Sequence, residues 1–267
     1  MTALVLADLR ARWRSLAGIG TGCLALLILL ASTYKGFGGA HGMAQNFGAG
    51  GLGKVMAALT GSSSTDIFGP AHFLGFGFAH PFVLTLAVGA AVSNAAGAIA
   101  ADVETGRAEM LYTAPVTRTA ILAARVTGWL IAEIFVLTCA IAGELVGSRM
   151  SPELSGTSPA VPFRVAVQFG SLLFFLGAAA FAASARARTR GVALGIAIAV
   201  AAGSYAANLV SLLWSPAGFV HHLNPFGYYN STSAADRVNW ADAGLLVSAG
   251  TLLLLLSRHW LERRDLT

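Results

Sequence analysis

Six long apolar segments constrain this chain more than any other feature. They cover residues 16–34, 81–101, 126–147, 164–184, 191–213 and 241–257. Each is close to the about 20 residues that a helix needs to cross the hydrocarbon core of a bilayer. Charged residues make up 11% of the 267 positions, too few to solvate the surface of a soluble globule. The sequence therefore predicts an all-α membrane protein with six transmembrane helices, folded as one transmembrane domain over residues 1–267.

The basic residues indicate the orientation of these spans, because cytoplasmic loops are enriched in Lys and Arg. With both termini inside, twelve of the 17 basic residues are cytoplasmic and five lie on longer outer loops. The inner set is Arg10, Arg12, Arg14, Arg107, Arg118, Arg125, Arg186, Arg188, Arg190, Arg258, Arg263 and Arg264. We expect a multi-pass protein with cytoplasmic termini. The excess of Arg over Lys favours the inner (cell) membrane of a bacterium.

The first residues have the pattern of a helix that lies on a membrane surface. Residues 3–15 place Leu6, Leu9 and Trp13 at helical spacing, and the charged residues fall mostly elsewhere around the helix. Such a helix lies in the interface with its basic face toward lipid headgroups. The sequence thus predicts an N-terminal interfacial helix, which serves either as a topogenic anchor or as a docking element.

The connection over residues 35–80 is predicted to be a long outer loop that contains a short helix at 52–60. A glycine-rich loop of this length is either a partly folded cap or a flexible loop. Its histidines are far apart in sequence, and Cys23 and Cys139 lie inside apolar spans, so no metal site is predicted. The basic residues are scattered without interleaved aromatics, which argues against a nucleic-acid partner.

Residues 102–125 form the most informative segment of the predicted cytoplasmic side. Acidic residues open it, a helical stretch follows, and Pro115 ends that helix. A second helix is expected to lead from about Thr117 into the third span. A polar helix–turn–helix joined rigidly to two spans suits a partner that moves both spans together. The alternative is a solvated loop with one charged face.

This segment resembles the cytoplasmic signature of ABC-2 type permeases, the membrane subunits of type-2 ABC exporters. Further similarities are residues 224–229 (Asn-Pro-Phe-Gly-Tyr-Tyr) and 263–266 (Arg-Arg-Asp-Leu), so the resemblance covers the whole chain. Arg107 and Ala108 stand where a Thr-Leu pair is common, and Asp102 stands where Glu is usual. The matching residues of the segment are Asp102, Glu104, Gly106, Glu109, Leu111, Pro115, Val116 and Arg118.

The resemblance implies that these matching residues form a coupling helix after the second span, which docks on a separate ATP-binding cassette subunit. Members of the family pair two such subunits with two permease subunits, here a homodimer or a sibling heterodimer in membrane lipid. The two lysines of this chain are followed by Gly36 and Val55, so it lacks the phosphate-binding loop of an ATPase. We therefore expect no enzyme activity and no cofactor in this chain, with ATP and Mg bound by the partner.

Polar residues inside the predicted spans are candidates for a translocation pathway. Ionisable groups at membrane depth are costly and usually face a partner or an aqueous cavity. Glu133 is therefore either part of such a pathway or one half of a structural ion pair. The other candidates are Ser93, Asn94, Tyr205 and Asn208. Small and polar residues of this kind also serve simply to let helices pack and hydrogen-bond.

Two other functions remain open from the sequence. One is an ATP-independent secondary transporter, for which Glu133 would be the ion-coupling group. The other is an intramembrane enzyme that uses His221 and His222 with Glu144 or Asp242, although no zinc-binding or serine-nucleophile motif is present. For the exporter, small and weakly polar cavity residues favour a hydrophobic or amphipathic substrate such as a drug, antibiotic or lipid.

Overall fold

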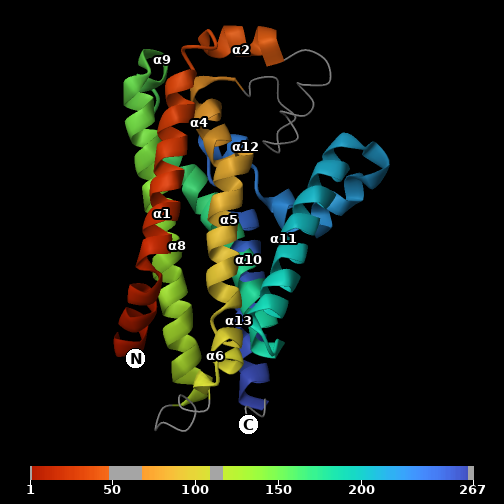
Figure 1. Ribbon diagram of the computed structural model, residues 1–267. Coiled ribbons are helices and arrows are strands. Elements are labelled where there is room, and N and C mark those ends of the chain that lie inside the picture. The colour runs from red at the N-terminus through yellow and green to blue at the C-terminus, as the bar shows by residue number, and fades with distance from the viewer. Residues whose placement is uncertain (1, 48–67, 109–116, 264–267) are drawn as a thin grey trace.

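The computed structural model describes residues 2–47, 68–108 and 117–263, and all regular structure in these ranges is helical (Figure 1). Two of the helices, η1 and η2, are 3-10 helices and the others are α-helices. In chain order they are α1 (Thr2–Thr33), α2 (Gly39–Phe47), α4 (Pro70–Ala79), α5 (Pro81–Ala96), α6 (Ala100–Glu104), α8 (Arg118–Met150), α9 (Pro152–Ser155), α10 (Ala160–Arg186), α11 (Arg190–Leu213), η1 (Ser215–Leu223), η2 (Pro225–Tyr228), α12 (Ser231–Asp236) and α13 (Trp240–Arg263).

Five single helices of the described chain are long and apolar enough to cross a membrane: α1, α8, α10, α11 and α13. A sixth span is complete if α4 and α5, which meet at an angle of 46°, cross together. The bend lies at His80, whose backbone is extended because the following residue is Pro81. The structure thus supports five or six spans. The bounds of the second span differ from the predicted 81–101. With α4 included, this span begins at Pro70, and it ends with α5 at Ala96.

The expected division between an N-terminal helix over 3–15 and a first span is absent. Residues 2–33 form one continuous helix, α1. At about 1.5 Å per residue this helix is about 48 Å long, well beyond the about 30 Å of a hydrocarbon core. About a third of α1 therefore extends past the core. An interfacial position for its first turns stays a prediction.

Helix α10 is the central element of the bundle. It packs against α5, α8, α11, α12 and α13, and it is the most buried of the candidate spans. Helix α1 packs along α8 on one side of the molecule, and α11 leans away from the bundle on the other (Figure 1). Helix α11 exposes apolar side chains that need lipid or a protein partner: Val192, Ile196, Val200, Val210, Leu212 and Leu213.

Part of the predicted outer loop belongs to the folded bundle. Helix α4, within residues 35–80, packs against α12 and α10, and Tyr34 donates a hydrogen bond to the carbonyl of Phe68 at 2.8 Å. Residues 68–79 are therefore folded into the bundle, and in the pairing of α4 with α5 they belong to the second span. The short helix predicted at 52–60 lies outside the described residues.

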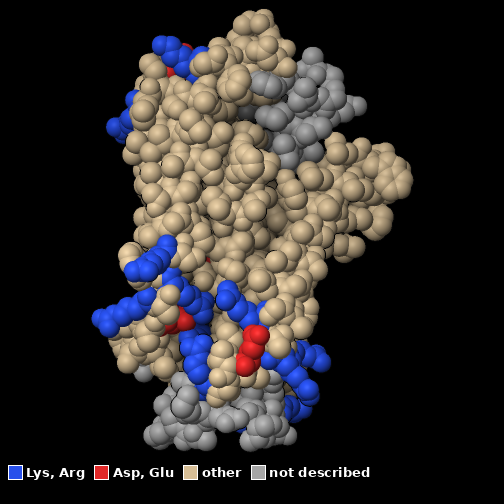
Figure 2. Space-filling view, viewed as in Figure 1, with Lys and Arg blue, Asp and Glu red and all other residues tan. Residues whose placement is uncertain are grey.

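Charged side chains are distributed unevenly over the surface. Figure 2 shows Lys and Arg gathered around the end that carries both termini, with a smaller group at the opposite end and an uncharged band between them. Such a band is what a surface in contact with lipid requires, because a charged side chain in the hydrocarbon region is costly. The surface therefore agrees with the predicted membrane location.

Candidate functional site

A buried ionic network lies at the end of the bundle that carries the termini. The Arg125 guanidinium, on α8, donates to Asp8 Oδ1 of α1 at 2.7 Å and to Asp102 Oδ2 of α6 at 2.6 Å. The side chains of Asp8 and Asp102 are 9% and 5% exposed, and that of Arg125 is 16% exposed. Arg125 thus joins three helices, and removing its charge leaves two buried carboxylates without their shortest ion pair.

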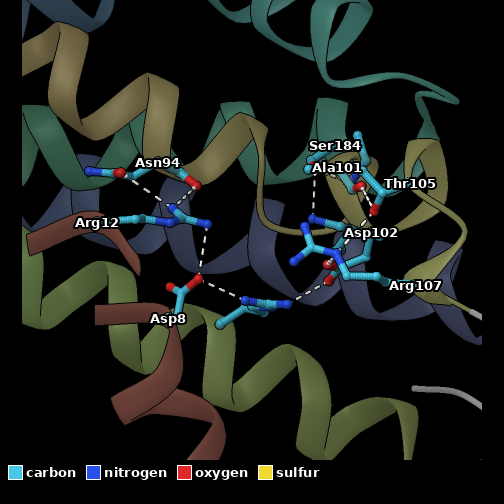
Figure 3. A network of polar contacts seen from close by, with 11 residues as sticks. Asp8, Arg12, Asn94, Ala101, Asp102, Thr105, Arg107 and Ser184 are labelled. Atoms are coloured by element: carbon cyan, nitrogen blue, oxygen red, sulfur yellow. Dashed lines mark hydrogen bonds and ion pairs between the residues drawn. The ribbon is translucent and has the colours of Figure 1, made fainter. Parts of the chain in front are cut away.

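The network continues from α1 to α5. Arg12 is 3.0 Å from Asp8 Oδ1 and also donates to the main-chain carbonyl of Asn94 at 2.9 Å and to its side-chain oxygen at 3.3 Å (Figure 3). The last turn of α5 has carbonyl groups without helical partners, and an arginine at this position is favourable toward them. Asn94 is therefore a partner of Arg12.

Local capping explains where α6 begins and ends. The Ser184 hydroxyl, on α10, accepts hydrogen bonds from the main-chain N–H groups of Ile99 and Ala100 at 3.1 and 3.0 Å. At the other end, Gly106 has a φ of +69°, a left-handed conformation that glycine adopts without steric cost. The predicted coupling residue Gly106 is thus the point at which the chain turns after α6.

The remaining contacts of this region connect it to α11. Glu104 accepts a hydrogen bond from the main-chain N–H of Arg190, the first residue of α11, at 2.9 Å. Arg107 lies 3.7 Å from Asp102 and donates to the Thr105 hydroxyl at 3.0 Å (Figure 3). The segment from residue 100 to 107 therefore contacts α8, α10 and α11, and Arg125 links it to α1.

Helix α8 starts where the sequence predicted a helix to begin, near Thr117. Thr117 caps the helix by accepting from the N–H of Ala120 at 3.2 Å, as the predicted start near Thr117 requires. Arg118 donates to the carbonyls of Leu261 and Glu262 at 3.0 and 3.2 Å and so holds the end of α13. The other predicted coupling residues, Glu109, Leu111, Pro115 and Val116, lie outside the described residues.

A cavity of about 430 Å³ lies between α5 and α11. Its walls are mostly apolar, and Ser93, Tyr205 and Thr85 supply the polar groups. Phe226 of η2 closes one side and meets the Tyr205 ring edge-on at a centroid distance of 5.4 Å. The motif over residues 224–229 therefore packs against α11 beside this cavity. Two of the five predicted pathway residues, Ser93 and Tyr205, share it.

The other predicted pathway residues lie elsewhere. Asn94 is bound to Arg12, as described above. Asn208 is buried, and its side-chain oxygen lies 3.3 Å from Nδ1 of His221 in η1. Glu133, on α8, lines a different cavity, between α8, α10 and α13.

Sequence reasoning missed Asp8, Arg12 and Ser184 as parts of the site, and it treated Arg125 only as a topological signal. Asp8 carried a usable signal, since it is the single acidic residue in an otherwise basic N-terminal stretch. Its partner Arg125 is 117 residues away, and no local pattern predicts a pairing over that distance.

Of the residues named for the intramembrane-enzyme alternative, the structure places Asp242 near His221 but Glu144 elsewhere. Burial lowers the pKa of His221, as does neighbouring His222, whereas Asp242 raises it. Glu144 instead packs against Gly77 of α4, where a side chain would collide with the carboxylate. Within the described ranges, no three His, Cys, Asp or Glu residues are grouped so that they could hold a metal ion.

Comparison with known proteins identifies the family. The family described as ABC-2 family transporter protein matches residues 2–266. Neither the curated proteins nor the solved structures contain a match. The family match agrees with the helical bundle and with the resemblance seen in the sequence. The chain therefore belongs to the ABC-2 transporter family and is an integral membrane subunit of a transport system.

Proposed function

We propose that this chain is the permease subunit of an ATP-driven exporter and that its ATPase is a separate ATP-binding cassette subunit. The observation that carries the proposal is the Arg125 bridge between Asp8 and Asp102. It connects the segment expected to receive the ATPase with the first and third candidate spans. A buried three-charge contact is rigid, because separating its members exposes an unpaired charge to a poorly solvating interior.

In this proposal the ATPase docks on the cytoplasmic segment around residues 102–118. Movement of that segment passes through Arg125 to α1 and α8, and through Glu104 to the first residue of α11. Because α11 forms one wall of the α5–α11 cavity, a displacement of its cytoplasmic end changes the shape of that cavity. Two ATPase copies, which bind ATP and Mg, would then drive two permease subunits.

The α5–α11 cavity is proposed to form part of the translocation pathway. Its apolar lining with a few hydroxyl groups suits a hydrophobic or amphipathic substrate such as a drug, antibiotic or lipid. The exposed apolar face of α11 is proposed to pack against a second permease subunit, identical or a sibling. Both termini are proposed to lie in the cytoplasm of a bacterial cell, and the gathering of Lys and Arg at that end of the molecule supports this orientation.

Co-purification from native membranes tests the proposal. The full-length chain is tagged and extracted gently, and its partners and ATP hydrolysis are measured for the native sequence and for Arg125→Gln. We expect a stoichiometric ATP-binding subunit with the native chain. The Arg125→Gln variant should retain about a tenth or less of the ATP-binding subunit that the native chain retains. Losing one member of a buried ion pair costs more than about 1.4 kcal/mol, which is the free energy of a tenfold change in binding.

Arg258→Gln is the matched control, since it removes an arginine near the same end whose side chain is 52% exposed. It should leave the partner and the ATPase activity unchanged. Each variant must elute from size-exclusion chromatography as the native protein does. A chain that purifies without any ATP-binding subunit under several mild conditions would support the ATP-independent transporter instead. Full retention by Arg125→Gln would show that the bridge does not position the docking segment.

A further inference from the structure

A second cavity, of about 640 Å³, lies between α8, α10 and α13 and shares no lining residue with the α5–α11 cavity. Its walls are formed by aliphatic and aromatic side chains, with Trp129, Phe163, Phe174 and Trp240 among them. Glu133 is the single ionisable residue of the lining. An apolar cavity with one charged group is the usual form of a site that orients a small ligand.

Glu133 is buried without an opposite charge. Its residue is 6% exposed, and neither carboxylate oxygen has a hydrogen bond of good geometry in the described part of the chain, although the Trp129 indole lies next to it. It lies about 22 Å along α8 from Arg118 at the helix start, near the middle of the 33-residue helix. A carboxylate at this depth is costly unless it meets an opposite charge or hydrogen-bond donors. No basic residue lines the cavity, so the carboxylate must either take up a proton or pair with a cation from outside these residues.

Trp129, one turn before Glu133, forms a fixed part of the wall. Its ring lies 5.6 Å from that of Phe174 and 5.4 Å from that of Phe181, between centroids. Gly177 makes room for it, because a Cβ at that position would overlap the indole. The indole nitrogen is also buried without a hydrogen-bond partner in the described ranges. The indole and the Glu133 carboxylate therefore lie side by side in one wall on a rigid backing.

The cavity opens on the surface of the bundle rather than into its centre. Trp240 is 72% exposed, Ile134 61% and Phe163 52%, and all three belong to the lining. A ligand could therefore enter sideways from the apolar surroundings of the helices. The aromatic rings near the carboxylate favour a cation, since the face of an aromatic ring attracts positive charge.

We propose that this cavity binds a lipophilic amine, a molecule with an apolar body and one protonated amino group. The ammonium donates to the Glu133 carboxylate and neutralises it, and the apolar body fills the space between α8, α10 and α13. Charge complementarity selects this class over a neutral lipid chain, which would leave the carboxylate unpaired. The site is separate from the proposed pathway, so the proposal does not depend on the assignment of this chain as an exporter subunit.

Photo-cross-linking tests the proposal on the full-length chain in nanodiscs of phosphatidylcholine. The probe is dodecylamine with a diazirine on its alkyl chain, and the matched neutral probe is the corresponding dodecanol. We expect the amine to label peptides of α8, α10 and α13 that line the cavity. Glu133→Gln should lower this labelling about tenfold or more. This is the change expected when an ion pair that contributes about 1.4 kcal/mol in a water-poor site is lost.

Two further variants separate the site from general effects on the protein. Glu144→Gln changes another buried carboxylate of α8 that does not line the cavity, and it should leave the labelling unchanged. Gly244→Phe keeps Glu133 but fills the cavity, since a side chain at Gly244 meets nothing within 4 Å. It should abolish labelling. Equal labelling by the alcohol, undiminished labelling of Glu133→Gln, or labelled peptides elsewhere would overturn the proposal.

Discussion

At the scale of single residues, two glycines decide how closely α1 and α8 approach. A Cβ at Gly143 would lie 2.7 Å from the Leu24 carbonyl oxygen, and one at Gly147 would lie 2.6 Å from the Ala31 Cβ and 3.0 Å from the Ile28 Cα. The two glycines are four residues apart and so share one face of α8. This spacing of small residues lets membrane helices pack with their backbones in contact.

We therefore expect Gly147→Val to destabilise the bundle. The added side chain meets the backbone of α1, which has no flexible end to move aside, and overpacking of this kind costs about 1–3 kcal/mol. Thermal unfolding of the detergent-solubilised protein, followed by size-exclusion chromatography, should show a lower midpoint. Gly18→Val on α1 is the control, because its Cβ meets nothing within 4 Å. Equal midpoints for the two variants would contradict the close packing of α1 and α8.

At the scale of elements, α6 depends on contacts from other helices. It has five residues, and isolated helices of this length are not stable in water. Its first N–H groups are satisfied by Ser184 of α10, and its last residue, Glu104, binds the start of α11. A short helix held in this way keeps its conformation only while its neighbours stay in place. It is therefore suited to report a movement of the bundle or to pass one on.

Ser184→Ala should loosen α6 without disturbing α10. The substitution leaves the N–H groups of Ile99 and Ala100 buried and unpaired, at a cost of about 1–3 kcal/mol. Hydrogen–deuterium exchange measured by mass spectrometry should be faster, by about tenfold or more, in peptides that cover residues 98–104. Ser171→Ala is the control, since the Ser171 hydroxyl bonds only the carbonyl of Gln168 in its own helix. Unchanged exchange in Ser184→Ala would mean that this cap does not hold α6.

At the scale of the whole molecule, features carried by local pattern could be predicted and those made by distant pairs could not. Apolar runs long enough for a bilayer predicted six spans, of which the structure supports five or six, and Thr117 marked the start of α8. The bend at His80 went unseen because Pro81 was taken as the beginning of a span rather than as its middle. The Arg125 bridge and the Glu133 cavity arise only when helices far apart in sequence pack together, so the spacing of residues along the sequence could not predict them.

Orientation in the membrane is the property of the whole molecule that remains to be measured, and it follows from where charge gathers. Lys35 is exposed just after α1, and Arg258 is exposed near the end of α13, at the end of the bundle that carries the termini. In a background with Cys23→Ala and Cys139→Ala, we expect a membrane-impermeant maleimide to label Lys35→Cys in intact cells. Arg258→Cys should be labelled only after the cells are opened, because the arginine-rich end stays in the cytoplasm. The reverse labelling pattern would show that the protein has the opposite orientation. The Arg125 bridge would then lie outside the cell, away from any cytoplasmic ATPase.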